Sequence, residues 1–133
     1  MKEPSWVEER VALAIHARLL AVHGGAEGLR DEGLVQSALA RPRQLFAYSK
    51  SPSPAGMAAA YIAGLVRNHP FVDGNKRTGC VVGVLFLETN GCRFTAGEED
   101  ATRAVVDLAA GVLDEEGFVS WLGNQIKSSR KKR

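Results

Sequence analysis

The stretch His69-Pro70-Phe71-Val72-Asp73-Gly74-Asn75-Lys76-Arg77-Thr78-Gly79 concentrates polar chemistry between two apolar segments. It holds an imidazole, a carboxylate, an amide, two cations and two glycines. The apolar segments are residues 57–66 before it and 80–87 after it. Polar groups between buried segments are costly unless they are paired or do chemistry. We therefore expect an active-site loop that leads into the N-terminus of a helix.

The flanking segments predict two central antiparallel helices joined by this loop. Ser53-Pro54 supplies an N-cap and a first-turn proline for a helix over 54–68, which is apolar on nearly every face. The second helix is expected over 75–89, and Asn90-Gly91 is its C-cap. Helices that are apolar all round are buried, so this pair should form the core.

Before the central pair, the pattern predicts an amphipathic helix. Ser5 and Glu8 have the spacing of a capping box, and apolar residues repeat at helical spacing over 7–22. His16 and His23 lie on or near this helix. Neither has a ligand partner close in sequence, so we expect both to be structural or solvated.

A second helix is expected between the first one and the core. Asp31 can cap a helix over 32–40, and Pro42 should end it, because proline disfavours the helical conformation of the preceding residue. A brief helical piece over 43–48 follows.

After the core, residues 92–95 should be short and extended, and Gly97 leads into an amphipathic helix. Asp114 caps a last helix, whose inward face we expect to include Ile126. No alternating strand pattern runs for long. The sequence predicts an all-α fold, a compact bundle of six to seven helices around the central antiparallel pair.

The charges divide the chain into a body and a tail. The formal net charge is +2, but residues 127–133 hold five of the 17 basic residues. Residues 1–126 then carry 12 basic and 15 acidic groups, a net charge of −3. We expect a single domain over 1–126 and a basic, disordered tail over 127–133. The acidic body argues against direct binding of nucleic acid.

Nothing in the sequence indicates export or a membrane. The N-terminus lacks the apolar run of a signal peptide, and the run 81–87 is far short of the roughly 20 residues of a membrane span. Cys80 and Cys92 have no metal-binding spacing. We expect a soluble, cytoplasmic protein that does not bind membranes.

The loop has the features of a phosphate site. A helix that starts near Gly74-Asn75 points free N–H groups at the loop, and Lys76 and Arg77 add charge at the same place. Two cations oppose the helix dipole there, so an external anion is needed. Mg²⁺ bound by Asp73 and phosphate oxygens removes the repulsion between carboxylate and phosphate. His69 is a candidate general base near pH 7.

Other kinds of site fit the loop less well, and one alternative stays open. The spacing Gly74 to Gly79 resembles a Walker motif, but the Lys-Ser/Thr that must follow is absent. A zinc pair of His69 and Asp73 lacks further ligands nearby. No nucleophile elbow marks a Ser/His/Asp triad. A purely structural loop, in which Asp73 caps the helix and both cations extend into solvent, stays open.

The motif resembles the signature of the Fic/Doc family, His-x-Phe-x-Asp/Glu-Gly-Asn-Gly-Arg-x-x-Arg. It departs at Lys76, where the signature has glycine, and at Cys80, where it has the final arginine. The Asn-Lys-Arg-Thr version is that of the Doc-type (death-on-curing) toxins. Gly28-Leu29-Arg30-Asp31 also looks Doc-like, and the resemblance covers most of residues 5–125.

The resemblance implies roles for the matching residues. His69 is the implied general base, and Asp73 the implied ligand of Mg²⁺. The implied ATP-binding and anion-binding residues are Gly74, Asn75, Lys76, Arg77 and, with less support, Arg67.

The resemblance also implies a reaction. Doc-type proteins phosphorylate a Thr or Ser of elongation factor Tu with the γ-phosphate of ATP, which arrests translation. Lys76 and Cys80 favour this kinase reaction over the AMP transfer of most Fic enzymes. Transfer of AMP and a catalytically silent binding partner are the alternatives.

The expected partner is an antitoxin of the Phd type. Many Fic enzymes carry an inhibitory helix with the pattern Ser/Thr-x-x-x-Glu-Gly/Asn. The nearest match, Ser5 to Glu9, is followed by Arg10 and fails the last position. Inhibition must then come from outside the chain, and we expect the free protein to be a monomer.

Overall fold

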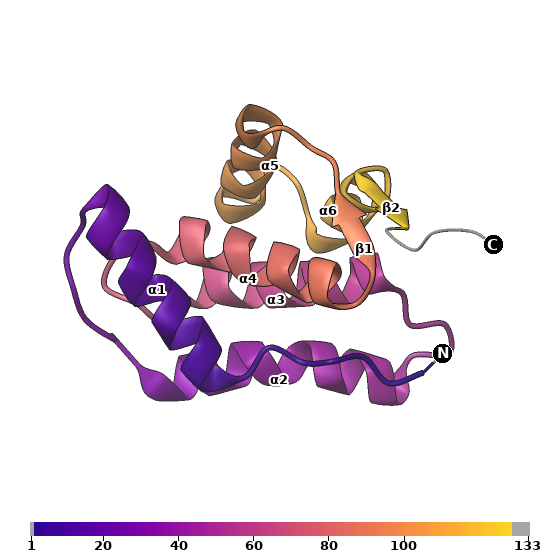
Figure 1. Cartoon of the computed structure of the whole chain (residues 1–133), viewed down its shortest axis with the longest axis horizontal. Coiled ribbons are helices and arrows are strands. Elements are labelled where there is room, and N and C mark those ends of the chain that lie inside the picture. The colour runs from indigo at the N-terminus through magenta and orange to yellow at the C-terminus, as the bar shows by residue number, and fades with distance from the viewer. Residues whose placement is uncertain (1, 129–133) are drawn as a thin grey trace.

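The computed structural model describes residues 2–128. In chain order its elements are α1 (Glu9–His23), α2 (Glu32–Tyr48), α3 (Pro54–Asn68), α4 (Asn75–Thr89), β1 (Cys92–Phe94), α5 (Glu98–Ala110), α6 (Glu115–Gly123) and β2 (Ile126–Ser128). Figure 1 shows α3 and α4 side by side at the centre, with α2 along one side and α5 and α6 on the other. The helix α1 crosses one end of the pair. The predicted helical bundle is confirmed.

The central helices α3 and α4 pack closely because α3 presents buried side chains and α4 presents glycines on the facing side. Every residue over 57–66 of α3 is buried. On the facing side of α4, a Cβ added at Gly79 would lie 2.9 Å from Val66, and one at Gly83 would collide with Ile62. Glycine is therefore required where the helices meet, and the contact fixes the position of α4 relative to the core.

Three of the predicted caps are confirmed. Asp31, Ser53 and Asp114 each accept a hydrogen bond from the backbone N–H three residues on, at 3.3, 3.0 and 2.7 Å. These bonds satisfy N–H groups that the first turn of a helix leaves free. Local chemistry therefore decides where α2, α3 and α6 begin.

The predicted end of the second helix is wrong. The helix α2 runs through Pro42, which is buried. Pro42 removes one backbone hydrogen bond at a cost of about 3 kcal/mol. The inward face nevertheless continues at helical spacing, through Val35, Ala38, Leu39 and Pro42. Packing of this face against α3 outweighs the local cost.

The predicted capping box is also wrong. The helix α1 begins at Glu9 and has no side-chain cap. Ser5 instead pairs with Asn90: its N–H donates to Oδ1 at 2.8 Å, and its carbonyl accepts from Nδ2 at 2.9 Å. Two residues on, the N–H of Val7 donates to the Tyr61 hydroxyl at 2.9 Å. These contacts hold the segment extended along the core.

The end of the chain differs from the prediction as well. The last helix ends at Gly123, and Ile126 lies in β2. Lys127 and Ser128, which we assigned to the tail, form β2 with Ile126 and pair antiparallel with β1 in the register Arg93 to Lys127. The other tail positions, 129–133, lie outside the described residues. None of the helices over 2–128 is both long and apolar enough to cross a membrane.

Candidate active site

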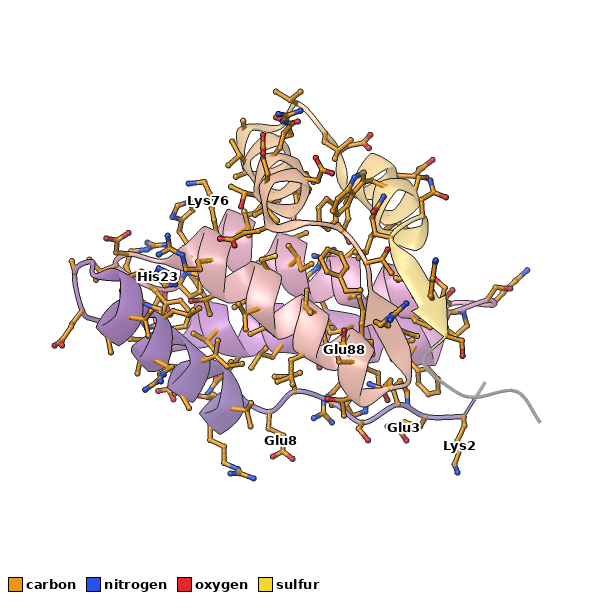
Figure 2. The ribbon with its side chains drawn as sticks, turned by 45° about the horizontal axis from the view of Figure 1, so that its top comes forward. Lys2, Glu3, Glu8, His23, Lys76 and Glu88 are labelled. Atoms are coloured by element: carbon orange, nitrogen blue, oxygen red, sulfur yellow. The ribbon has the colours of Figure 1, made fainter. Side chains whose placement is uncertain are left out.

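One cavity of about 710 Å³ brings most of the predicted site residues together. Its lining includes His69, Asp73, Gly74, Asn75, Lys76 and Arg77. Further walls come from the end of α1, from the segment that joins β1 to α5, and from α5 itself. Figure 2 shows Lys76 and His23 at the same end of the molecule, with Glu88 at the opposite end of α4. The cavity therefore lies where α1, α4 and α5 meet.

The first turn of α4 opens into this cavity. The helix begins at Asn75, as predicted, and its N-cap is Gly74 in the left-handed region at φ 83° and ψ 16°. Glycine adopts this conformation at little cost. No side chain caps the helix there. The first backbone N–H groups of a helix have no partner within it, so this turn can bind an anion.

Lys76 and Arg77 are exposed on this turn. Over the described residues neither forms an ion pair or a hydrogen bond. Two unpaired cations at the positive end of a helix repel the helix dipole and each other. An anion bound between them and the backbone removes this repulsion, which favours a polyanionic ligand such as a nucleotide.

Asp73 lies at the edge of this anion site. Its Oδ1 accepts from the N–H of Gly74 at 2.8 Å, and its Oδ2 accepts from the N–H of Ala26 at 3.3 Å. The residue before Ala26 must be small, because a Cβ on Gly25 would lie 2.9 Å from Oδ2. The loop between α1 and α2 thus helps to fix the position of the Asp73 carboxylate.

The donor set at Asp73 fits Mg²⁺ only with help from a ligand. Residues 2–128 contain no group of three or more His, Cys, Asp or Glu side chains that could hold a metal ion. Each carboxylate oxygen of Asp73 keeps a lone pair beside the hydrogen bond that it accepts. Mg²⁺ is commonly bound by one carboxylate, phosphate oxygens and water, and Asp73 next to an anion site fits that pattern.

The side-chain amide of Asn75 holds the loop together through hydrogen bonds. It is buried, and its Oδ1 accepts from the N–H of Phe71 at 3.0 Å. Its Nδ2 donates to the carbonyl of Phe71 at 3.0 Å and lies 3.2 Å from Nδ1 of His69. The two bonds to Phe71 fix which end of the amide is nitrogen. Since Nδ2 can only donate, Nδ1 of His69 accepts, and the neutral ring carries its proton on Nε2.

His69 is exposed at the mouth of the cavity. It is the C-cap of α3, in the left-handed region at φ 49° and ψ 55°. The next anchor is Phe71, which is 2% exposed and fixes the loop to the core. The backbone of His69 therefore lies between the end of α3 and the buried Phe71, and its side chain is accessible from the cavity.

His16 is the residue that sequence reasoning missed. It is buried, its ring stacks on Phe71 with centroids 3.7 Å apart, and its Nε2 lies 2.8 Å from the carbonyl oxygen of Asp73. The available signal was position: His16 shares the inward face of α1 with Ala12, four residues earlier. His23, which we also expected to have no site role, lines the cavity.

Arg67 lies elsewhere. Its NH1 is 3.9 Å from Oε1 of Glu115 on α6, and it does not line the cavity. Glu115 is also bound by Arg41 at 2.8 Å. The helical position of Arg67 directs it toward α6, so the structure does not bring it to the other site residues.

Two residues after the loop take different places. Thr78 is fully buried and outside the cavity lining. Cys80 does line the cavity. Burial raises the pKa of its thiol above the ordinary value, so near pH 7 it contributes a neutral, weakly polar wall.

Comparison with known proteins places these features in one family. The sequence profile of the Fic/DOC family matches residues 6–87. A protein named Toxin Doc from Mycolicibacterium smegmatis is 40% identical over 93 residues, which is 69% of this chain and 67% of that protein. A protein named Protein kinase doc from Escherichia phage P1 is 28% identical over 115 residues, 86% of this chain and 87% of that protein.

Proposed function

Since the chain belongs to the Fic/Doc family, we propose that it is a Doc-like toxin that transfers the γ-phosphate of ATP to a Thr or Ser hydroxyl of a translation protein. By resemblance, that protein is elongation factor Tu, and its modification arrests translation in the cytoplasm. The observation that supports this most is the cavity in which His69, Asp73 and the open first turn of α4 meet.

The phosphates of ATP bind at the first turn of α4. Its free N–H groups, Lys76 and Arg77 supply the positive charge. Asp73 would hold Mg²⁺, which would supply positive charge to the phosphate oxygens. Phosphoryl transfer depends mainly on alignment and charge, and these groups provide both.

His69 serves as the base. The substrate hydroxyl oxygen attacks the γ-phosphorus, its proton passes to the imidazole, and the bond to the bridging oxygen breaks to release ADP. For this step the ring must first take the other neutral tautomer, with its proton on Nδ1 and a free lone pair on Nε2, so the contact between Nδ1 and Asn75 must open. That contact is 3.2 Å long, which is weak, and catalytic hydrogen bonds commonly rearrange when substrate binds.

Two residues favour transfer of the γ-phosphate over transfer of AMP. Lys76 carries a side chain where the family signature has glycine, which crowds the backbone beside the first turn. Cys80 is a neutral thiol in the cavity where the signature has arginine, so it cannot grip distal phosphates. Both features favour ATP bound with its γ-phosphate next to His69.

The test is incubation with elongation factor Tu, ATP and Mg²⁺, followed by intact-mass measurement of the factor. We expect the mass to rise by one phosphoryl group with the parent chain and to stay unchanged with His69→Ala. A rise by one AMP group would replace the kinase reaction with nucleotide transfer. An unmodified factor, incubated with chain that arrests growth in cells, would remove the target.

The proposal includes a partner. We propose a Phd-like antitoxin that neutralises a free, monomeric toxin. Growth arrest on expression of the chain alone, relieved by co-expression of a neighbouring antitoxin gene, is the expected result. Arrest that persists with His69→Ala would show that toxicity does not come from this site.

A further inference from the structure

The backbone of His69 requires an external hold. His69 is the only residue other than glycine with a positive φ over residues 2–128. The left-handed region is unfavourable for a residue with a Cβ, and such strain persists only where the surroundings impose it. Some group near His69 must therefore favour this conformation.

Arg30, in the loop between α1 and α2, is that group. Its Nε donates to the carbonyl of His69 at 2.6 Å, and its NH2 donates to the carbonyl of Asn68 at 2.8 Å. These carbonyls belong to the two peptide units that flank the His69 Cα. The guanidinium is planar and rigid, so it can reach both oxygens only while they face the same side. The two bonds therefore favour a conformation of His69 in which its flanking carbonyls face the same side, as they do at the observed φ and ψ angles.

The surroundings of Arg30 support this role. The backbone N–H of Arg30 donates to the carbonyl of Pro70 at 2.7 Å, and Leu29 forms an isolated antiparallel bridge with Phe71. The guanidinium also lies at the C-terminus of α3, where the last carbonyls are free and the helix dipole favours a cation. Main chain and side chain therefore hold the same short segment.

Arg30 acts without reaching the substrate, because it does not line the cavity. We propose that Arg30 is a positioning residue for His69, whose guanidinium fixes the two peptide units beside it and so sets where the imidazole meets the attacking hydroxyl. This inference rests on the proposed phosphotransfer. Positioning matters at this scale, because a misplacement of about 1 Å can reduce a rate by about 100-fold.

The experiment compares three variants. Arg30→Met keeps an unbranched stem and removes every donor, and Arg30→Lys keeps the charge but lacks the planar fork. Arg103→Met is the matched control, because Arg103 is an exposed arginine that forms only a long pair, 3.8 Å, with Glu99. With Arg30→Met we expect kcat to fall by about 10- to 100-fold while the KM for ATP changes less than about twofold. Arg30→Lys should recover only part of this loss, and Arg103→Met should behave as the parent.

A double variant shows whether the effect passes through His69. His69→Ala should leave only a slow rate, below the change that intact mass detects but measurable as transfer of radiolabelled phosphate, and in this background Arg30→Met should cause no further loss of that rate. An equal loss in both backgrounds, or a rise in KM for ATP that accounts for the whole effect, would overturn the positioning role.

A second readout needs no activity, so it separates this inference from the proposed function. The side-chain amide of Asn75 contacts His69, so its NMR resonances and those of the His69 ring report the loop directly. Both sets should shift in Arg30→Met and stay in place in Arg103→Met. Unchanged resonances in Arg30→Met would refute the inference even if the chain is a kinase. If the resonances shift but the chain phosphorylates no target, the proposed function is refuted, while the positioning of His69 by Arg30 is supported.

Discussion

Replacing Asn75 with alanine removes the internal bracing of the site. The side chain makes two hydrogen bonds to the backbone of Phe71, both 3.0 Å long, and a weaker contact with His69. Phe71 is 2% exposed, so water cannot replace the lost amide without opening the loop. The substitution leaves one buried N–H and one buried carbonyl without partners.

The magnitude follows from these two groups. An unsatisfied buried donor or acceptor costs roughly 1–3 kcal/mol, so with two such groups Asn75→Ala should lower the free energy of unfolding by about 2–6 kcal/mol. Small domains are stable by only about 5–15 kcal/mol, so this loss would be a large part of the total stability. The variant should still fold, with a site loop that opens more often.

Asn90 at the other end of α4 provides a matched control. It also makes three hydrogen bonds, to the N–H and carbonyl of Ser5 and to the carbonyl of Phe86, at 2.8, 2.9 and 2.8 Å. Ser5 is exposed, so water can satisfy its backbone after Asn90→Ala. We expect that variant to lose only about 1 kcal/mol.

Denaturant unfolding gives both free energies, and hydrogen exchange of the Phe71 amide gives the local effect. In the parent this amide should exchange slowly, and in Asn75→Ala it should exchange far faster than the amides of α3. If Asn75→Ala costs no more than Asn90→Ala, or if the Phe71 amide stays protected, the bracing is not the role of Asn75.

Three further predictions concern the core, the missed histidine and the thiol. Gly83→Ala places a methyl group against Ile62 and should lower the free energy of unfolding by about 1–3 kcal/mol in denaturant; an unchanged midpoint would mean that α3 and α4 are loosely packed. His16→Phe keeps an aromatic ring but removes the donor to the carbonyl of Asp73, so Mg²⁺-dependent ATP binding, measured by calorimetry, should weaken roughly 2- to 10-fold. His16→Gln keeps a donor and should recover the affinity. Equal weakening in both variants would contradict a role for the hydrogen bond. Because burial raises the pKa of the Cys80 thiol, alkylation should be slow at pH 7, rise only above the ordinary thiol pKa, and be blocked by ATP, as peptide mass spectrometry can show; rapid labelling at pH 7 would contradict the buried thiol.

The parts of the fold that local chemistry decides could be predicted from the sequence. The caps Ser53 and Asp114, the all-apolar helix α3 and the start of α4 after Gly74 all depend on residues a few positions apart. The same holds for most of the site, because the residues from His69 to Arg77 are consecutive. Their shared cavity follows from one helix N-terminus.

The parts that long-range contacts decide could not be predicted. Ser5 is extended because Asn90, 85 residues away, binds its backbone. His16 and Arg30 reach the site from other elements, and no spacing along the chain indicates that they meet it. Arg67 shows the opposite error, since being close to His69 in sequence does not place its side chain on the face of α3 that meets the cavity.

The close contact of α3 with the glycines of α4 links the stability of the fold to the geometry of the proposed active site. The helix α4 forms half of the core through Gly79 and Gly83, and its own first turn carries the anion site. If the proposed function holds, a substitution that pushes these helices apart should move the backbone N–H groups of this turn away from the phosphates of ATP at a temperature below that of unfolding. Mildly overpacked variants at this contact should therefore be temperature-sensitive. We expect them to be active at low temperature and inactive at higher temperature, although every catalytic side chain is unchanged.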